Sequence, residues 1–128
     1  MLGLLMVPGM SDAAVTQESF LLRNASDLVD VCSAAQSDPF YTAAANFCQG
    51  FVVGVFRVLN EETVADPSMR LFCLPEHPPT RNEGIVEFVH WAKSNSSQLG
   101  QSPADAVAAF LSQRFPCQSG VKSGGAAR

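Results

Sequence analysis

The longest apolar stretch of the chain runs from residue 40 to residue 60 and reads FYTAAANFCQGFVVGVFRVLN. Helical spacing places its polar side chains in a single stripe that only one valine interrupts: Thr42, Asn46, Gln49, Arg57 and Asn60. A helix that is apolar around most of its circumference is normally covered by other elements. We therefore predict a long central helix here, more deeply buried than any other element of the domain.

This stretch is also long enough to cross a bilayer, at about 30 Å for a helix that rises 1.5 Å per residue. Asn46, Gln49 and Arg57 argue against a span because polar side chains are costly in hydrocarbon, so no membrane insertion of the mature chain is expected. Gly50 and Gly54 lie four residues apart on one face. Each costs roughly 0.5–1 kcal/mol relative to alanine in a helix, so we predict that another backbone packs closely against them.

A first, short helix is predicted before the central one, over residues 25–36. It begins after Asn24, which can cap it with Asp27 three residues later. The turn that follows contains Asp38, placed to cap the central helix, and Pro39, suited to its first position. Residues 15–23 fit either a helical turn or an extended lead-in.

Capping signals also predict a third and a fourth helix. Thr80 with Glu83 forms the reciprocal capping pattern, and Ser102 followed by Pro103 and Asp105 gives another strong start. The positions expected to face the core are Ile85, Phe88, Val89 and Ala92 in the third helix, and Val107, Phe110, Leu111 and Phe115 in the fourth.

The remaining segments read as connections. Residues 61–70 are polar and predict an exposed loop, residues 71–79 form a stiff proline-rich segment, and residues 95–101 form a polar loop. No period-two pattern of strand length occurs. The fold class predicted is therefore all-α, a compact four-helix domain around the long central helix.

Composition narrows the class of protein. With 128 residues the chain is long enough for one domain. Its net charge is −4 and only 16% of its residues are charged, with the eight Lys and Arg scattered along the chain. Nucleic-acid binding needs clustered positive charge, so a nucleic-acid partner is not expected.

Four cysteines in a short chain indicate either two disulfides or a zinc site. Zinc sites draw their ligands from close pairs, whereas here 15, 24 and 43 residues separate successive cysteines. Disulfides are the better interpretation and imply an oxidising compartment.

Both ends of the chain look separate from the domain. Residues 1–14, MLGLLMVPGMSDAA, resemble the end of a signal peptide with a small-residue cleavage site, although the basic start is missing. A disordered apolar tail is the alternative. Residues 118–128 are rich in Gly and Ser and are expected to be disordered, which leaves 15–117 as the helical domain.

Four landmarks then indicate a family: Cys32 near the end of the first helix, FCQGFVVGV at 47–55, CLP at 73–75 and FPC at 115–117. In this order they closely resemble the Rap/Tai family of type VI secretion amidase immunity proteins. The resemblance spans Leu28 to Cys117 and departs from the family pattern around residues 79–81 and in the loop at 94–99.

The resemblance implies a small periplasmic helical protein, stapled by disulfides and often a homodimer, that binds a secreted peptidoglycan amidase and blocks its active site. Pairing Cys32 with Cys48 would tie the first helix to the central one, and pairing Cys73 with Cys117 would tie the proline-rich segment to the last helix. Two other connectivities remain possible. Bridges over loops of this length contribute about 3 and about 4 kcal/mol respectively on the loop-entropy model.

No catalytic constellation is expected. The two histidines, His77 and His90, would need a chance tertiary meeting to form a metal or catalytic site, and bridged cysteines are not nucleophiles. No serine lies in the G-x-S-x-G pattern. We predict no enzyme activity, no cofactor and no metal.

Binding surfaces are then the candidates for function. An inhibitor of a cleft enzyme needs a narrow feature on a rigid scaffold, and loops supply such features. The candidate partner-binding residues are Glu61, Glu62, Asp66 and Met69 in the connection after the central helix and Gln98 and Leu99 in the loop at 94–101. A plain solvated loop is the simpler reading for any one of them. An exposed apolar or glycine-lined face of the central helix is an alternative as a twofold dimer interface.

Two other functions compete with immunity. One is a small periplasmic holdase or stress protein that exposes apolar surface in acid and has no dedicated partner. The other is a purely structural member of the family without a toxin. Binding to an amidase would distinguish the immunity function from both alternatives.

Overall fold

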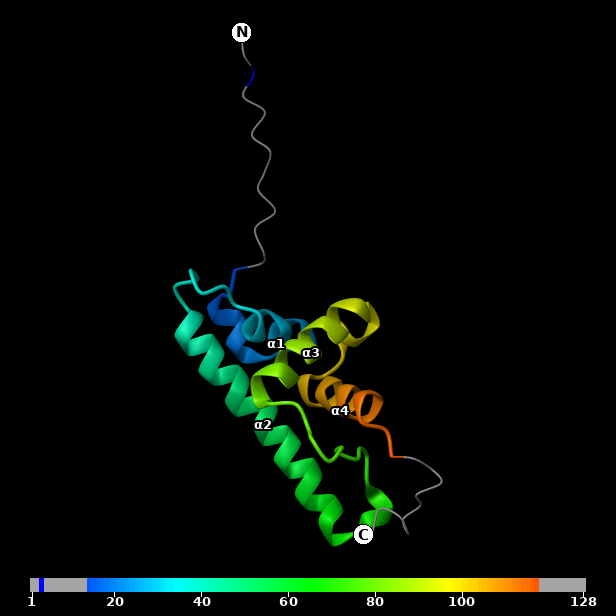
Figure 1. Cartoon of the computed structure of the whole chain (residues 1–128). Coiled ribbons are helices and arrows are strands. Elements are labelled where there is room, and N and C mark those ends of the chain that lie inside the picture. The colour runs from blue at the N-terminus through cyan, green and yellow to red at the C-terminus, as the bar shows by residue number, and fades with distance from the viewer. Residues whose placement is uncertain (1–2, 4–13, 118–128) are drawn as a thin grey trace.

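The computed structural model describes residue 3 and residues 14–117; the predicted signal remnant and the predicted tail lie outside these residues, apart from Gly3 and Ala14. The described chain folds into four α-helices and three short 3-10 helices without a β-strand (Figure 1). The α-helices are α1 (Ala25–Cys32), α2 (Tyr41–Ala65), α3 (Arg81–Ser94) and α4 (Pro103–Arg114), and the 3-10 helices are η1 (Gln17–Leu21), η2 (Pro67–Met69) and η3 (Ser96–Gly100). The predicted all-α, four-helix fold is confirmed.

Side-chain caps begin three of the four helices where the sequence places them. The Asn24 side chain accepts a hydrogen bond from the backbone N–H of Asp27 at 3.1 Å, and α1 begins at the next residue. Thr80 and Glu83 form the reciprocal capping box of α3. Ser102 caps α4 with Pro103 at the first helical position. Each cap satisfies an N–H that the helix itself leaves unpaired.

The bounds of α1 and α2 differ from those predicted. Helix α1 ends at Cys32, four residues early. The N–H of Ser33 makes the last helical bond to the Val29 carbonyl at 2.9 Å, and the Ser33 hydroxyl donates to the same carbonyl at 2.6 Å. Helix α2 begins only at Tyr41, because the Asp38 carboxylate accepts from Phe40 N at 2.8 Å and from the distant Val15 N at 3.0 Å. At its other end α2 continues to Ala65, so Glu61 and Glu62 belong to the helix instead of to a loop.

The main core lies between α1, α3 and α4. Leu28, Phe88 and Val107 are almost fully enclosed, and the Phe88 ring contacts Phe110 edge-to-face and stacks beside Trp91. A smaller cluster fills the space between α1, α2 and α3 and consists of Val15, Val31, Ala44, Cys48 and Ile85. All four predicted core positions of α4 are buried, as are three of the four in α3.

Helix α2 is the longest helix, as predicted, but it is not the most buried one. Only Ala44 and Cys48 are buried among its described side chains, and the helix lies along one side of the molecule (Figure 1). Its stretch Tyr41–Glu62 has the length and composition of a membrane span, with 11% of that apolar window buried. At 25 residues α2 is about 37 Å long, whereas the other α-helices have 8 to 14 residues. The shorter helices therefore cover one face of α2 and leave the opposite face open.

Close packing at the two glycines of α2 is also absent among the residues that the structure describes. Gly50 and Gly54 are exposed, and a methyl group added to either would meet no atom within 4 Å. The prediction that another backbone of this chain packs there is wrong. The glycines lie on the face that the other helices leave open.

Two disulfides staple the helices together. Cys32 is bonded to Cys48, with a Cα–Cα distance of 5.1 Å, and Cys73 is bonded to Cys117, with a Cα–Cα distance of 4.9 Å. The first joins α1 to α2, and the second joins the segment after η2 to the end of α4. Of the three connectivities that the sequence allows, the structure has this one, and all four cysteines are used.

Candidate partner-binding surfaces

The described residues offer binding surfaces more readily than reactive groups. No group of three or more His, Cys, Asp or Glu side chains in this part of the chain is arranged to hold a metal ion. His77 and His90 are both exposed, one in the proline-rich segment and the other on α3. Surfaces with exposed apolar side chains are therefore the features to examine.

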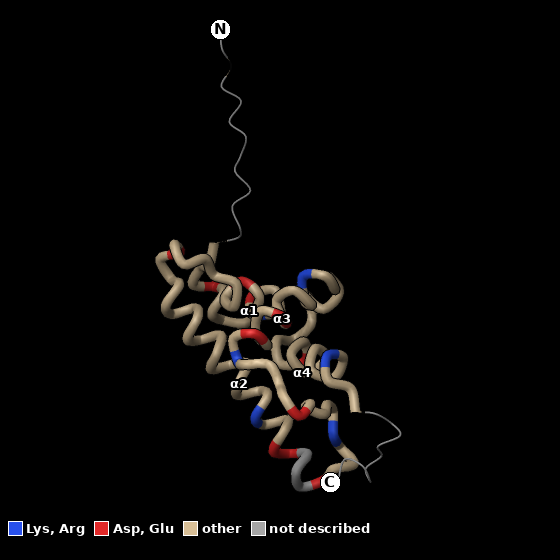
Figure 2. Tube along the Cα trace, in the orientation of Figure 1, with Lys and Arg blue, Asp and Glu red and all other residues tan. Residues whose placement is uncertain are grey.

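The first surface lies at the C-terminal end of α2, where the chain turns back through η2. We call it the corner and define it by its exposed apolar and acidic side chains: Val58, Glu61, Glu62, Asp66, Met69, Leu71 and Leu74. Four of these are the predicted partner-binding residues that precede or lie within η2. Figure 2 shows basic and acidic positions gathered around this end of α2. The corner therefore combines exposed apolar side chains with acidic ones, and an exposed apolar patch bordered by polar groups is a feature of protein-binding surfaces.

Two anchors hold the corner in place. The Asp66 carboxylate accepts from the backbone N–H of Ser68 at 3.1 Å and from its hydroxyl at 2.6 Å, which fixes the turn that carries Met69. Leu71 and Leu74 flank Cys73, whose N–H donates to the Phe115 carbonyl at 2.8 Å and whose sulfur is bonded to Cys117. These exposed side chains therefore sit on an anchored backbone, and binding through them would lose less conformational entropy.

The predicted loop at 94–101 is built differently. It forms η3, in which Gln98 and Leu99 are half-buried and Leu99 packs against the main core. The Gln101 carbonyl accepts from Ala25 N at 2.8 Å, so the end of the loop is tied to the start of α1. In Figure 1, η3 and η2 lie at opposite ends of the molecule. The structure thus does not bring the two sets of predicted partner residues together, and it exposes only the first.

A second surface is the open face of α2. Residues 43, 47, 50, 54 and 58 follow one another at helical spacing and are all exposed: Ala43, Phe47, Gly50, Gly54 and Val58. Phe47 contacts the Phe20 ring, but the two glycines between Phe47 and Val58 leave a shallow apolar stretch where an added methyl group would meet no atom within 4 Å.

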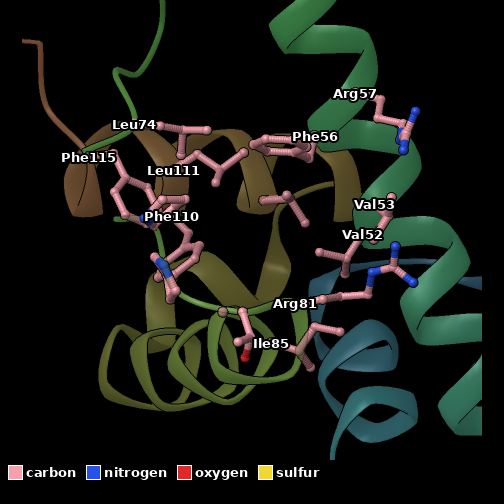
Figure 3. Close-up of a pocket in the computed structure, with 15 residues that line it drawn as sticks. Val52, Val53, Phe56, Arg57, Leu74, Arg81, Ile85, Phe110, Leu111 and Phe115 are labelled. Atoms are coloured by element: carbon pink, nitrogen blue, oxygen red, sulfur yellow. The ribbon is translucent and has the colours of Figure 1, made fainter. Parts of the chain in front are cut away.

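The third feature is an open cavity of about 270 Å³ between α2, α3 and α4, which the proline-rich segment helps to line (Figure 3). Most of its lining is apolar: Val52, Val53, Phe56, Leu74, Pro78, Pro79, Ile85, Val107, Phe110, Leu111 and Phe115, with Gly84 and Thr80. Figure 3 shows Phe56 and Val52 on one side facing Leu111 and Phe110 on the other. Arg57 and Arg81 complete the lining, and their guanidinium groups lie on the α2 side.

Sequence reasoning did not find this cavity. Its walls come from three stretches that lie far apart in the sequence, 52–57, 74–85 and 107–115, and no motif marks them. The signal that existed was the proline pair at 78–79, which prevents this segment from forming a helix and keeps it extended beside α3. Only the tertiary arrangement turns that segment into a wall.

These features define the class of protein: a disulfide-stapled helical protein with exposed apolar surfaces suited to binding another molecule. The chain matches the family model of Rap1a immunity proteins over residues 24–117, well over half of its length, and it therefore belongs to this family. The matched range contains all four α-helices, both disulfides, the corner and the cavity, and it confirms the family resemblance. Comparison with curated proteins found no match, and comparison with solved structures found none.

Proposed function

We propose that this protein is a periplasmic immunity protein that binds a peptidoglycan amidase delivered by type VI secretion and blocks its active site, without catalysis of its own. The family match over residues 24–117, which include all four α-helices, carries this proposal, because an immunity protein acts by binding a partner effector. The two disulfides support an oxidising compartment such as the periplasm. The target class and the mode of action come from the resemblance to the Rap/Tai family.

The corner is the surface we propose for effector binding. Met69 is 65% exposed and Leu71 47% exposed, and both sit on the anchored turn and segment described above. Preorganised apolar side chains at the end of a long helix form a narrow projection, the shape that entry into an enzyme cleft requires. The acidic side chains of Glu61, Glu62 and Asp66 would then set specificity and association rate more than affinity.

The test begins with a search for a neighbouring gene that encodes a small amidase. Binding to that amidase is then measured by isothermal titration calorimetry, and its inhibition by peptidoglycan hydrolysis. The double variant Met69→Asp/Leu71→Asp should lose at least about 30-fold in affinity, since interface hot spots contribute about 2 kcal/mol or more. Val86→Asp is the matched control, because Val86 is 57% exposed but lies on α3 outside the corner.

The outcomes separate the parts of the proposal. Failure of the unmodified protein to bind or inhibit the amidase would overturn the immunity function, and suppression of aggregation of unrelated proteins would then favour the holdase alternative. Tight binding that the double variant retains would leave the immunity function standing and overturn the corner as its site.

The open face of α2 is the surface we propose for a homodimer. A stripe of small residues allows two helices to approach closely across a twofold axis, and this would supply the close packing that Gly50 and Gly54 lack within one chain. Light scattering after gel filtration should show a dimer that Phe47→Asp converts to a monomer and that Val86→Asp leaves intact. A monomeric unmodified protein would refute the dimer.

The Cys32–Cys48 bridge, which holds α2 on α1, supports the prediction that α2 does not enter a membrane.

A further inference from the structure

The cavity beside α2 differs in charge from the rest of the molecule. Its only charged lining residues are Arg57 and Arg81, and no Asp or Glu lines it. The whole chain carries a net charge of −4. An apolar opening with a positive border in an acidic protein selects for a ligand that is apolar at one end and anionic at the other.

The two arginines are available for a ligand. The ion pairs in the described part of the chain use Arg23 and Arg114, and neither Arg57 nor Arg81 makes a side-chain hydrogen bond or ion pair within it. A guanidinium group presents paired donors that match the two oxygens of a carboxylate. Both side chains are long and exposed, so their charged ends are free to turn toward an anion at the opening.

The volume of the cavity limits the size of the apolar part of the ligand. A dry cavity of about 150 Å³ lined by aliphatic and aromatic side chains accepts benzene. At about 270 Å³ with similar walls, this cavity has room for a larger hydrocarbon group. Because it is open, a ligand can keep its charged end outside while its chain is enclosed.

We propose that the cavity binds a free medium-chain fatty acid, with the hydrocarbon chain between α2 and α4 and the carboxylate paired with Arg57 and Arg81. The apolar walls exclude water from the hydrocarbon chain of the ligand, and the two arginines select its anionic head group. This binding does not depend on the proposed effector interaction, since the purified protein alone is sufficient for it.

Isothermal titration calorimetry with hexanoate, octanoate and decanoate, each below its micelle concentration, tests the apolar part. Each enclosed methylene should strengthen binding about fourfold, so each two-carbon step should give about 15-fold until the chain fills the cavity. Stoichiometry should be one ligand per chain. Nonyltrimethylammonium, with the same nine-carbon chain and a positive head, should bind at least about tenfold more weakly than decanoate.

Two pairs of variants locate the site. Arg57→Gln/Arg81→Gln should weaken decanoate binding at least tenfold, whereas Arg70→Gln, outside the cavity, should not. Gly84→Leu should abolish binding because its side chain would project into the cavity, and a Cβ at this position meets no atom within 4 Å, so the fold should persist. Gly100→Leu is the control for added volume outside the cavity, because Gly100 is exposed and a Cβ there also meets no atom within 4 Å. Circular dichroism checks that each variant is folded.

Several results would overturn the proposal. Absence of saturable decanoate binding to the unmodified protein would do so, as would equal binding of the cationic amphiphile or binding that Gly84→Leu leaves unchanged. Association with phosphatidylglycerol vesicles without binding of free decanoate would assign the surface to a membrane instead.

Discussion

Helices α1 and α2 are joined by a disulfide and differ almost completely in burial. Five of the eight residues of α1 are buried, whereas only two of the described side chains of the 25-residue α2 are. The sequence of α2 is nonetheless the most apolar in the chain. A short helix can be surrounded by its neighbours, whereas a helix longer than all of them extends past what they can cover. Apolar sequence therefore marks a structural core in one place and an open surface in the other.

The region of the molecule that supplies most of the stability therefore differs from the regions where we propose binding. The α1, α3 and α4 core holds the large enclosed side chains, while the open face of α2, the corner and the cavity border expose apolar groups. Substitutions of the same residue type in the two regions should then have very different effects on the free energy of unfolding.

The strongest contrast should come from two phenylalanines. Phe88 is 1% exposed and packs on Phe110 and Trp91, so Phe88→Ala should lower the free energy of unfolding by about 3–5 kcal/mol. Phe47, on the open face of α2, is 38% exposed and contacts only the Phe20 ring among the aromatic residues described, so Phe47→Ala should cost less than about 1.5 kcal/mol. Urea unfolding followed by circular dichroism measures both, and equal losses would contradict the division of the molecule into these two regions.

The two disulfides should rank by the length of chain they enclose. Replacing both Cys73 and Cys117 by alanine should lower the free energy of unfolding by about 4 kcal/mol, and replacing Cys32 and Cys48 by about 3 kcal/mol. Loss of the Cys73–Cys117 bridge should also make the backbone of the corner more mobile, because Leu71 and Leu74 flank Cys73. Chemical denaturation gives the ranking, and hydrogen exchange at residues 70–74 reports the loosening; unchanged exchange there would argue against the disulfide as an anchor.

Residues of α1 should also determine how the free energy of unfolding changes in acid. The hydrogen bonds from Arg23 lower the pKa of the Asp27 carboxyl below its usual value, despite the opposing effect of burial. Stability from this ion pair is fully present above the unfolded pKa of about 3.9 and is lost as the pH falls through the folded pKa. Asp27→Asn should therefore flatten the fall in stability below about pH 4, the unfolded pKa of an Asp carboxyl.

Asp30 provides a control of opposite sign for that measurement. Burial, helped by the negative charge of Asp27, raises the pKa of the Asp30 carboxyl. Its contribution is thus favourable in acid and is lost as the pH rises through the folded pKa. Asp30→Asn should make the acid-induced loss steeper, and the same response from both variants would refute the assignment.

The smallest effect is expected at Gly54. Because an added methyl group meets nothing there, Gly54→Ala should raise the free energy of unfolding of the monomer by up to about 1 kcal/mol through helix propensity. On the covered side of the same helix, Ala44→Leu should instead cost about 1–3 kcal/mol, since Ala44 is fully enclosed. Thermal unfolding at low protein concentration measures both, and a loss at Gly54 would mean that a backbone packs there after all.

Part of the candidate site followed from sequence alone. The acidic and polar composition of residues 61–70 correctly placed Glu61, Glu62, Asp66 and Met69 at the surface. Leu99 was misplaced because a single leucine in a polar loop does not show whether the loop turns toward the core. The cavity could not be predicted because its walls meet only after three distant stretches of the chain have packed together.

The sequence by itself determined the four helices and most of their starts, because a cap is a hydrogen bond between residues only three positions apart, as at Asn24 and Thr80. It also determined that α2 would be long and apolar. Only the tertiary structure decided which face of α2 is covered, which cysteines pair and where the cavity lies. Burial depends on the lengths and positions of neighbouring elements, and the periodicity of one segment contains no information about how far its neighbours extend.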